Sequence, residues 1–98
     1  MCGISGFLHF DKERRADAGI IKKMTDVISH RGPDGEGFYV KQNTALGHRR
    51  LAIIDLSTGQ QPMYSDDNKI ALVFNGEIYN YLELREELIV LGNKFTTT

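Results

Sequence analysis

The sequence predicts an α+β fold of short strands and two helices. Three observations support this prediction: strand-like and helix-like segments alternate along the 98 residues, a two-residue polar turn joins a pair of strand-like segments, and the chain contains no repeat or low-complexity tract. With 41% hydrophobic and 26% charged residues, the composition is typical of a globular domain and argues against disorder. One hydrophobic core is therefore the expected maximum.

The first half of the chain predicts a strand, a helix and a hairpin. Residues 4–10 are short, apolar and interrupted by glycine, like a buried first strand, and residues 11–17 form a charged connection. Apolar residues recur at helical spacing over 18–29, and the Gly-Pro-Asp-Gly run at 32–35 ends that pattern. Residues 37–47 then predict a hairpin with its turn at a polar Gln-Asn pair.

The second half predicts two strands with a loop between them. Residues 51–56 and 69–74 are apolar and predict strands, and residues 57–67 predict the loop. The final stretch "NKFTTT" favours extended structure and resembles the start of another strand. We therefore expect the chain to be the N-terminal part of a larger domain, and to be marginally stable alone because a short chain buries a small fraction of its surface.

The second helix is predicted from its end signals and its apolar spacing. Asn80 and Glu83 have the spacing of a capping box at a helix start, and Gly92 is suited to end the helix. The leucines expected to share one face of the helix are Leu84, Leu88 and Leu91.

Charge and cysteine content restrict the expected partners. The 12 basic and 13 acidic residues leave a net charge near −1, so no nucleic-acid partner is predicted. The sequence contains no run of roughly 20 apolar residues, so no membrane span is predicted. A single cysteine cannot form an internal disulfide, so we expect a reducing, cytoplasmic compartment. The cysteine and three histidines lack metal-ligand spacing, so no metal site is predicted.

The only cysteine lies directly behind the initiator methionine, in the stretch "MCGISGF". If Met1 is removed, Cys2 carries a thiol and a free α-amine on one residue, which makes it a nucleophile with its own base. Neighbouring Gly3 and Gly6 would allow a substrate or another strand to approach closely. From its position alone, a small residue that begins a strand explains Cys2 equally well.

Three separated stretches resemble the class II glutamine amidotransferases in order and spacing: "MCGISGF", "HRGPDGEG" with "GHRRLAIIDL", and "FNGEIYNY". The stretches "NGEIYNY", "RGPDG" and "RRLAIIDLSTGQQPM" look most like the glutaminase domain of glutamine-hydrolysing asparagine synthetases. The resemblance implies an N-terminal nucleophile hydrolase fold, a four-layer αββα sandwich present here only in part. Residues 1–98 would be the N-terminal part of a type 2 amidotransferase domain, without its later strands and without the synthetase domain.

The resemblance also implies an activity: hydrolysis of glutamine to glutamate and ammonia, with Cys2 as the nucleophile that forms a thioester. The side-chain amide of Asn75 and the backbone N–H of Gly76 would form the oxyanion hole. Without the family pattern, an ordinary Asn-Gly turn is the better explanation of this pair.

Substrate recognition is assigned to two charged residues and one strand. A guanidinium suits the glutamine α-carboxylate, and Arg49 and Arg50 are both candidates. The family resemblance places the recurring arginine directly before the Leu-x-Ile strand, which implies Arg50 as the clamp and leaves Arg49 as a solvent-facing charge. Glu77 would hold the α-ammonium, with a solvated charge as the alternative. The strand residues expected to contact glutamine through their backbone are Leu51, Ala52, Ile53 and Ile54. A further acidic residue that helps to hold the ammonium is expected beyond Thr98.

Other polar residues receive supporting roles. His30, Arg31 and Asp34 are expected near the pocket, and His9 and His48 are expected to be structural. The chain itself should need no cofactor, whereas ATP and Mg²⁺ are expected in the missing synthetase domain. The expected partners are L-glutamine and that synthetase domain, with a homodimer left open. The alternatives are a truncated, non-catalytic amino-acid-binding or interaction module, and another class II amidotransferase.

Overall fold

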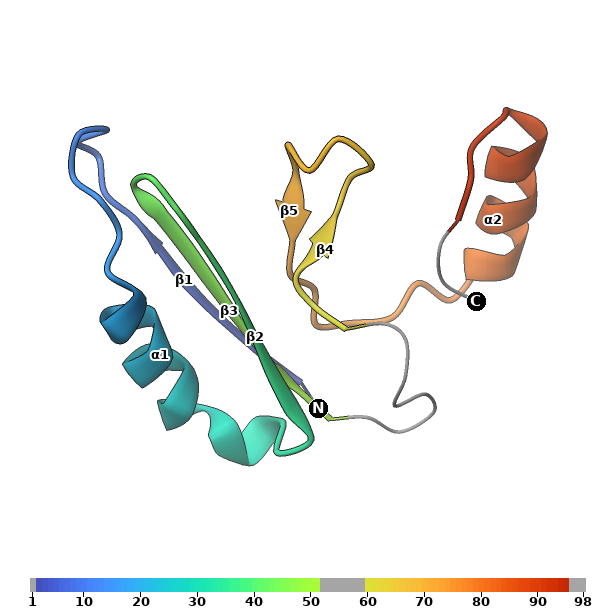
Figure 1. The fold of residues 1–98 in the computed structure, drawn as a ribbon. Coiled ribbons are helices and arrows are strands. Elements are labelled where there is room, and N and C mark those ends of the chain that lie inside the picture. The colour runs from blue at the N-terminus through green and yellow to red at the C-terminus, as the bar shows by residue number, and fades with distance from the viewer. Residues whose placement is uncertain (1, 52–59, 96–98) are drawn as a thin grey trace.

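The computed structural model describes residues 2–51 and 60–95, which form an α+β fold with two antiparallel sheets. Figure 1 shows the elements from one side to the other: a helix, a three-stranded sheet, a two-stranded sheet and a second helix. This order is compatible with part of an αββα arrangement, and the four-layer sandwich itself stays a prediction. The elements are β1 (Gly3–Leu8), α1 (Ala18–Val27), the 3₁₀ turn η1 (Ser29–Arg31), β2 (Gly35–Lys41), β3 (Thr44–Arg50), β4 (Met63–Tyr64), β5 (Ala71–Leu72) and α2 (Tyr81–Val90).

The larger sheet has the strand order β1-β3-β2, and both pairs are antiparallel. The predicted hairpin is confirmed: β2 and β3 are joined by Gln42 and Asn43, and Gln42 adopts a positive φ of 53°. Strand β3 continues to Arg50, beyond the predicted end of the hairpin: Arg49 still pairs with both β1 and β2, and Arg50 pairs with Gly35 of β2. Leu51 follows directly, and residues 52–56 of the predicted next strand lie outside the described residues.

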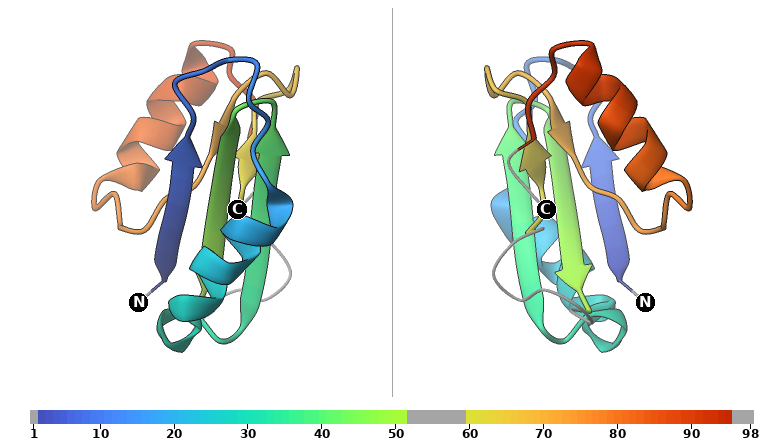
Figure 2. Two further views of the ribbon diagram at one scale, coloured as in Figure 1. Left: turned by 90° about the vertical axis from the view of Figure 1, so that its left-hand side faces the viewer. Right: turned by 90° about the vertical axis from the view of Figure 1, so that its right-hand side faces the viewer.

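Helix α1 covers one face of this sheet, as both views in Figure 2 show. Its first turn is capped by Asp17, whose side chain accepts a hydrogen bond of 2.7 Å from the Gly19 N–H. The buried Thr25 hydroxyl lies 2.9 Å from the Ser5 hydroxyl of β1 and donates to the Ile21 carbonyl. A side chain at Gly47 of β3 would collide with Thr25, so glycine is required for this close packing.

The smaller sheet lies over the opposite face. Tyr39 of β2 and Tyr64 of β4 pack with their ring centroids 6.2 Å apart. Strand β4 lies within the predicted loop over 57–67, and only Ala71–Leu72 of the strand predicted over 69–74 form β5. Turn contacts explain the shortening: Ser65 accepts from the Ile70 N–H and contacts Asp67, which ties the residues before β5 into a turn rather than a ladder.

Helix α2 lies apart from the other elements in Figure 1, and none of its residues is buried. No described element covers the leucine face predicted for this helix, since Leu84, Leu88 and Leu91 are 39%, 40% and 73% exposed. The predicted capping box is wrong, since Asn80 makes no side-chain cap bond. The predicted end is confirmed: Gly92 has a φ of +97°, and hydrogen bonds from Gly92 to Ile89 and from Asn93 to Leu88 form a Schellman motif.

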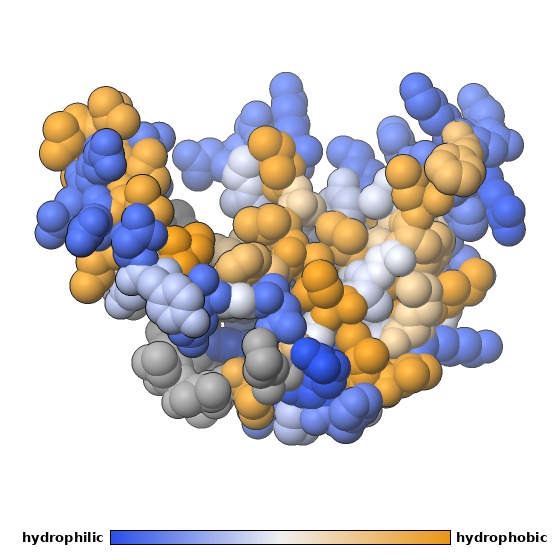
Figure 3. Space-filling model, turned by 180° about the vertical axis from the view of Figure 1, so that it is seen from behind, coloured by the Kyte–Doolittle hydropathy of each residue, from blue (hydrophilic) through white to orange (hydrophobic). Residues whose placement is uncertain are grey.

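Much apolar surface is exposed in this chain. The first strand was expected to be buried, but Ile4 and Leu8 are 50% and 58% exposed because no described element covers their side of β1. Seen from behind, apolar side chains gather over α2 and over the middle of the molecule (Figure 3). The Cα radius of gyration is 15.1 Å, compared with about 13 Å for a compact domain of 100 residues. The described elements therefore form an open arrangement.

Candidate active site

Cys2 lies where β1 begins and β3 ends. Its half-buried Sγ accepts a hydrogen bond of 3.3 Å from the Leu51 N–H, and its carbonyl accepts one of 3.2 Å from Arg31 Nε. Gly3 is buried behind it, and an added Cβ there would lie 3.0 Å from Ile28. The structure thus brings Cys2 together with Leu51, and Arg31 supports the Cys2 backbone.

Arg50 lies on the face of β3 that is turned toward the smaller sheet. It lines a cavity with His48, two residues earlier on the same strand face, and with Gln61 from the segment before β4. Asp34 also lines the cavity, and its N–H donates to the Arg50 carbonyl. The complete lining is Asp34, Gly35, Glu36, His48, Arg50, Gln60 and Gln61.

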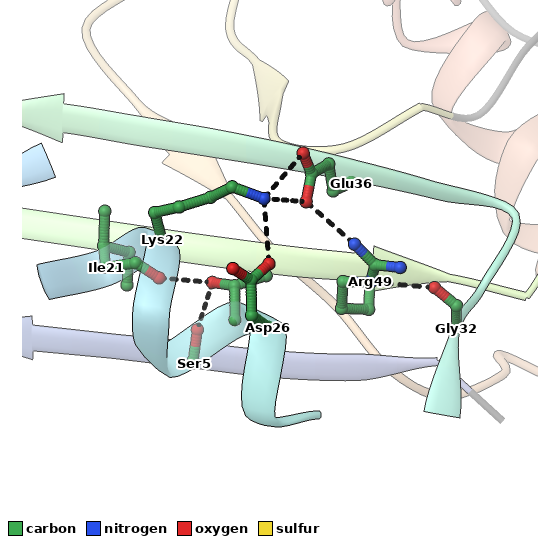
Figure 4. Close-up of polar contacts among 8 residues, drawn as sticks. Ser5, Ile21, Lys22, Asp26, Gly32, Glu36 and Arg49 are labelled. Carbon is green, nitrogen blue, oxygen red and sulfur yellow. Dashed lines mark hydrogen bonds and ion pairs between the residues drawn. The ribbon is translucent and has the colours of Figure 1, made fainter. Parts of the chain in front are cut away.

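Arg49 lies on the opposite face of β3, and the expectation that it faces solvent is wrong. It is not a solvent-facing charge: its side chain is 14% exposed, donates 2.9 Å to the Gly32 carbonyl and donates 2.8 Å to Glu36. Glu36 also pairs with Lys22, and hydrogen bonds to Asp26 and Glu36 raise the pKa of Lys22 (Figure 4). Alternation along a strand separates the two arginines, so Arg49 joins β3 to α1 and β2 while Arg50 faces the cavity.

His48 is buried, as expected of a structural residue, with 1% of its surface exposed. Burial lowers the pKa of His48 below its usual value of 6.5; a hydrogen bond with the Phe74 backbone opposes this shift, and the nearby charge of Arg50 adds to it. Its Nε2 has no hydrogen-bond partner among the described residues. His48 is therefore a buried residue on β3 that contributes to the cavity lining.

Asn75, Gly76 and Glu77 follow β5 in that segment. The preceding residue, Phe74, is held by Gln61: its N–H donates 2.5 Å to Gln61 Oε1, and its carbonyl accepts 3.0 Å from Gln61 Nε2. Asn75 is half-buried, whereas Gly76 and Glu77 are exposed. Among the described residues, neither Cys2 nor residues 75–77 line the cavity around Arg50.

The structure therefore joins the expected site residues in two groups. Cys2 contacts Leu51, and Arg50 shares a cavity with His48 and Gln61, while Asn75 is connected to that cavity through Phe74. Ala52, Ile53 and Ile54 lie outside the described residues. His30 is exposed on η1.

Sequence reasoning missed Gln61. The stretch "STGQQPM" was part of the family resemblance, but no local pattern indicates that its second glutamine pairs with a backbone 13 residues further along. Across residues 2–51 and 60–95, no group of three or more histidine, cysteine or carboxylate side chains could hold a metal ion. No helix in that part of the chain is long and apolar enough to cross a membrane.

Comparison with known families covers the whole chain: residues 1–98 match the model of the glutamine amidotransferase domain. The chain belongs to the glutamine amidotransferase domain family. The glutamine-hydrolysing asparagine synthetase 1 of Bacillus subtilis is 45% identical to this amidotransferase domain over 101 residues, which cover 99% of the chain and 16% of that relative.

Two eukaryotic relatives extend the comparison. A probable glutamine-hydrolysing asparagine synthetase of Schizosaccharomyces pombe is 44% identical over 99% of the chain and 17% of its own length. The glutamine-hydrolysing asparagine synthetase 1 of Arabidopsis thaliana is 39% identical over 99% of the chain and 16% of its own length. The amidotransferase domain described here thus spans about a sixth of the length of these relatives.

Proposed function

We propose that this amidotransferase domain hydrolyses glutamine to glutamate and ammonia, and that a synthetase domain of the full-length protein uses the ammonia to make asparagine. The main observation behind this proposal is that residues 1–98 match the glutamine amidotransferase domain and that relatives named as glutamine-hydrolysing asparagine synthetases match 99% of the chain. The position of Cys2 supports it, because the Sγ accepts a hydrogen bond from the residue directly after Arg50. Nucleophile and carboxylate clamp would then lie on adjoining ends of paired strands.

Cys2 would carry the covalent chemistry. The Cys2 α-amine takes the thiol proton, and the sulfur adds to the side-chain amide carbon of glutamine. The C–N bond then breaks, and ammonia leaves with the proton that the α-ammonium returns. Water then adds to the thioester, glutamate is released and the thiol is restored. The α-amine serves both steps only after Met1 has been removed, because a peptide nitrogen cannot act as a base.

The remaining site residues would bind charge. Arg50 pairs with the α-carboxylate through its planar guanidinium, and Glu77 holds the α-ammonium. The Asn75 side chain and the Gly76 N–H donate to the oxyanion that forms when Cys2 attacks. Leu51 and the following residues, Ala52, Ile53 and Ile54, would contribute backbone contacts to glutamine.

The synthetase domain would bind ATP and Mg²⁺, and this chain would contribute no ligand to either. We propose the cytoplasm as the compartment, on the basis of the single unpaired cysteine.

Replacement of the nucleophile in the full-length protein tests the proposal. Cys2→Ala should abolish glutamine-dependent asparagine formation and leave ammonia-dependent formation unchanged, because only the first needs the thioester. Cys2→Ser is the matched variant, since it replaces the thiol by a hydroxyl of similar size that is a weaker nucleophile. Equal loss of both activities would show that Cys2 has a structural role.

A labelling experiment tests the nucleophile directly. Intact mass before and after incubation of the full-length protein with an electrophilic glutamine analogue should show loss of Met1 and one adduct on Cys2 that glutamine prevents. Retention of Met1 with no adduct would favour the alternative, a non-catalytic module that binds an amino acid or a partner.

A further inference from the structure

We propose that Gln61 is a positioning residue for glutamine hydrolysis: it holds the Phe74 backbone and thereby orients Asn75 and Gly76 toward the oxyanion. This inference rests on the proposed function, in which Asn75 and Gly76 form the oxyanion hole. It assigns a role in the reaction to a residue whose side-chain amide bonds the residue directly before Asn75.

The first step is the contact between Gln61 and Phe74. The side-chain amide of Gln61 bonds both polar groups of one residue, with 2.5 Å from the Phe74 N–H to Oε1 and 3.0 Å from Nε2 to the Phe74 carbonyl. Two bonds of opposite direction fix both the position and the rotation of a backbone unit. Strand β5 ends at Leu72, so Phe74 has no ladder partner to do this instead.

The second step is the anchoring of Gln61 itself. Its backbone lies so close to β2 that a Cβ on Gly37 would collide with the Gln61 carbonyl. The glycine therefore lets the segment before β4 lie flat against the larger sheet. Phe74 is thus tied through Gln61 to the same sheet that carries Arg50.

The third step is the position of Gln61 relative to the proposed carboxylate clamp. Gln61, Arg50 and the buried His48 line one cavity. The residue that holds Phe74 therefore lies in the same cavity lining as the residue that would bind the glutamine carboxylate.

These contacts affect chemistry because of where Phe74 lies. Its Cα is one peptide unit, about 3.8 Å, from that of Asn75, so a rotation of the Phe74 unit moves both proposed donors. Oxyanion donors stabilise the transition state only when they are already oriented, and a displacement of about 1 Å costs on the order of 10²-fold in rate. The Phe74 ring also contacts Gly76, where an added Cβ would lie 2.9 Å from Cζ.

Steady-state glutaminase kinetics of the full-length protein test this inference. Gln61→Ala should lower kcat for glutamine about tenfold and change KM less than about threefold, because Arg50 still binds the substrate. Gln61→Glu keeps the acceptor for the Phe74 N–H and loses the donor to its carbonyl, so its kcat should lie between those of the wild type and Gln61→Ala. Ammonia-dependent synthesis should be unchanged in both variants, which reports that the protein remains folded.

A matched control separates positioning from general loosening of the hairpin. Ser65→Ala removes side-chain hydrogen bonds in the turn between β4 and β5 without contacting Phe74. It should leave glutaminase kcat within about twofold of the wild type. A loss in Ser65→Ala as large as that in Gln61→Ala would overturn the inference.

A double-mutant cycle gives the decisive result. If Gln61 acts through Asn75, the double variant Gln61→Ala/Asn75→Ala should have the same kcat as Asn75→Ala alone, which we expect to lose 10²- to 10³-fold. Multiplicative losses would show that Gln61 acts elsewhere and would overturn the inference alone. If kcat falls less than about tenfold in Asn75→Ala, the proposed oxyanion hole is rejected, and the inference with it. The Cys2→Ala result reports separately on the nucleophile.

Discussion

At the scale of single residues, two adjacent arginines of β3 have different surroundings because their side chains lie on opposite faces of the strand. Arg49 pairs with Glu36 and the Gly32 carbonyl on the α1 side, and Arg50 lines the cavity on the other side. The sequence motif selected Arg50 for the site, which stays a prediction, and assigned Arg49 to solvent, which is wrong. The error arises because the partners of Arg49 come from another strand and another turn, which no local pattern indicates.

Replacing each arginine by lysine should separate these roles. Arg50→Lys loses the bidentate match to a carboxylate, so we expect the glutamine KM to rise about 10- to 100-fold with kcat within about threefold. Arg49→Lys is the matched control and should leave KM near the wild-type value. Steady-state kinetics on the full-length protein measure both constants, and the reverse pattern would transfer the carboxylate clamp to Arg49.

At the scale of elements, the two helix starts differ in a way that the sequence did not indicate. Asp17 accepts a hydrogen bond from the first turn of α1, whereas Asn80 makes no side-chain bond to α2 despite its capping-box spacing. The backbone of Asp17 is extended, whereas Asn80 has a φ of −100° and a ψ of 31°. An N-cap residue with an extended backbone can turn its side chain toward the N–H groups of the first helical turn.

Alanine substitutions at these two N-cap positions should therefore have unequal effects. Asp17→Ala is expected to destabilise α1 by about 1 kcal/mol. Asn80→Ala should change the stability of α2 by about a few tenths of a kcal/mol at most. Amide hydrogen exchange of the two helices in the full-length protein measures each effect locally. Equal protection losses in α1 and α2 would contradict the difference in capping.

The elements were predicted best where local rules are strongest. The two-residue turn, the α1 periodicity and the Gly92 stop all depend on neighbouring residues and were confirmed. The strand over 69–74 was wrong in length, because strand formation needs a pairing partner and β4 offers only Met63 and Tyr64. Apolar composition alone cannot supply that partner.

At the scale of the whole molecule, burial of His48 links stability to pH. Its pKa in the folded chain is lowered, chiefly by burial, so the unfolded chain takes up a proton at a higher pH than the folded chain. This contribution to stability is complete above the usual value of 6.5 and is lost as the pH falls from there toward the folded pKa.

Hydrogen exchange of β3 in the full-length protein at several pH values tests this expectation. After correction for the intrinsic exchange rate, protection should fall between about pH 7 and pH 5, and the dependence should flatten in His48→Gln, which cannot titrate. Carboxylates such as Asp67 titrate at lower pH, because hydrogen bonds from Ser65 and Lys69 lower its pKa below 3.8. The same pH dependence in His48→Gln would assign it to another group.

The sequence by itself determined the family, the nucleophile candidate and the carboxylate clamp candidate, because motif spacing and residue chemistry are readable without coordinates. It also determined the hairpin and α1, whose signals are local. Only the tertiary structure decided that Arg49 is paired, that α2 is uncovered in the described residues, and that Gln61 holds Phe74. These features join residues distant along the chain, and such contacts depend on how the sheets pack against each other rather than on any pattern of neighbours.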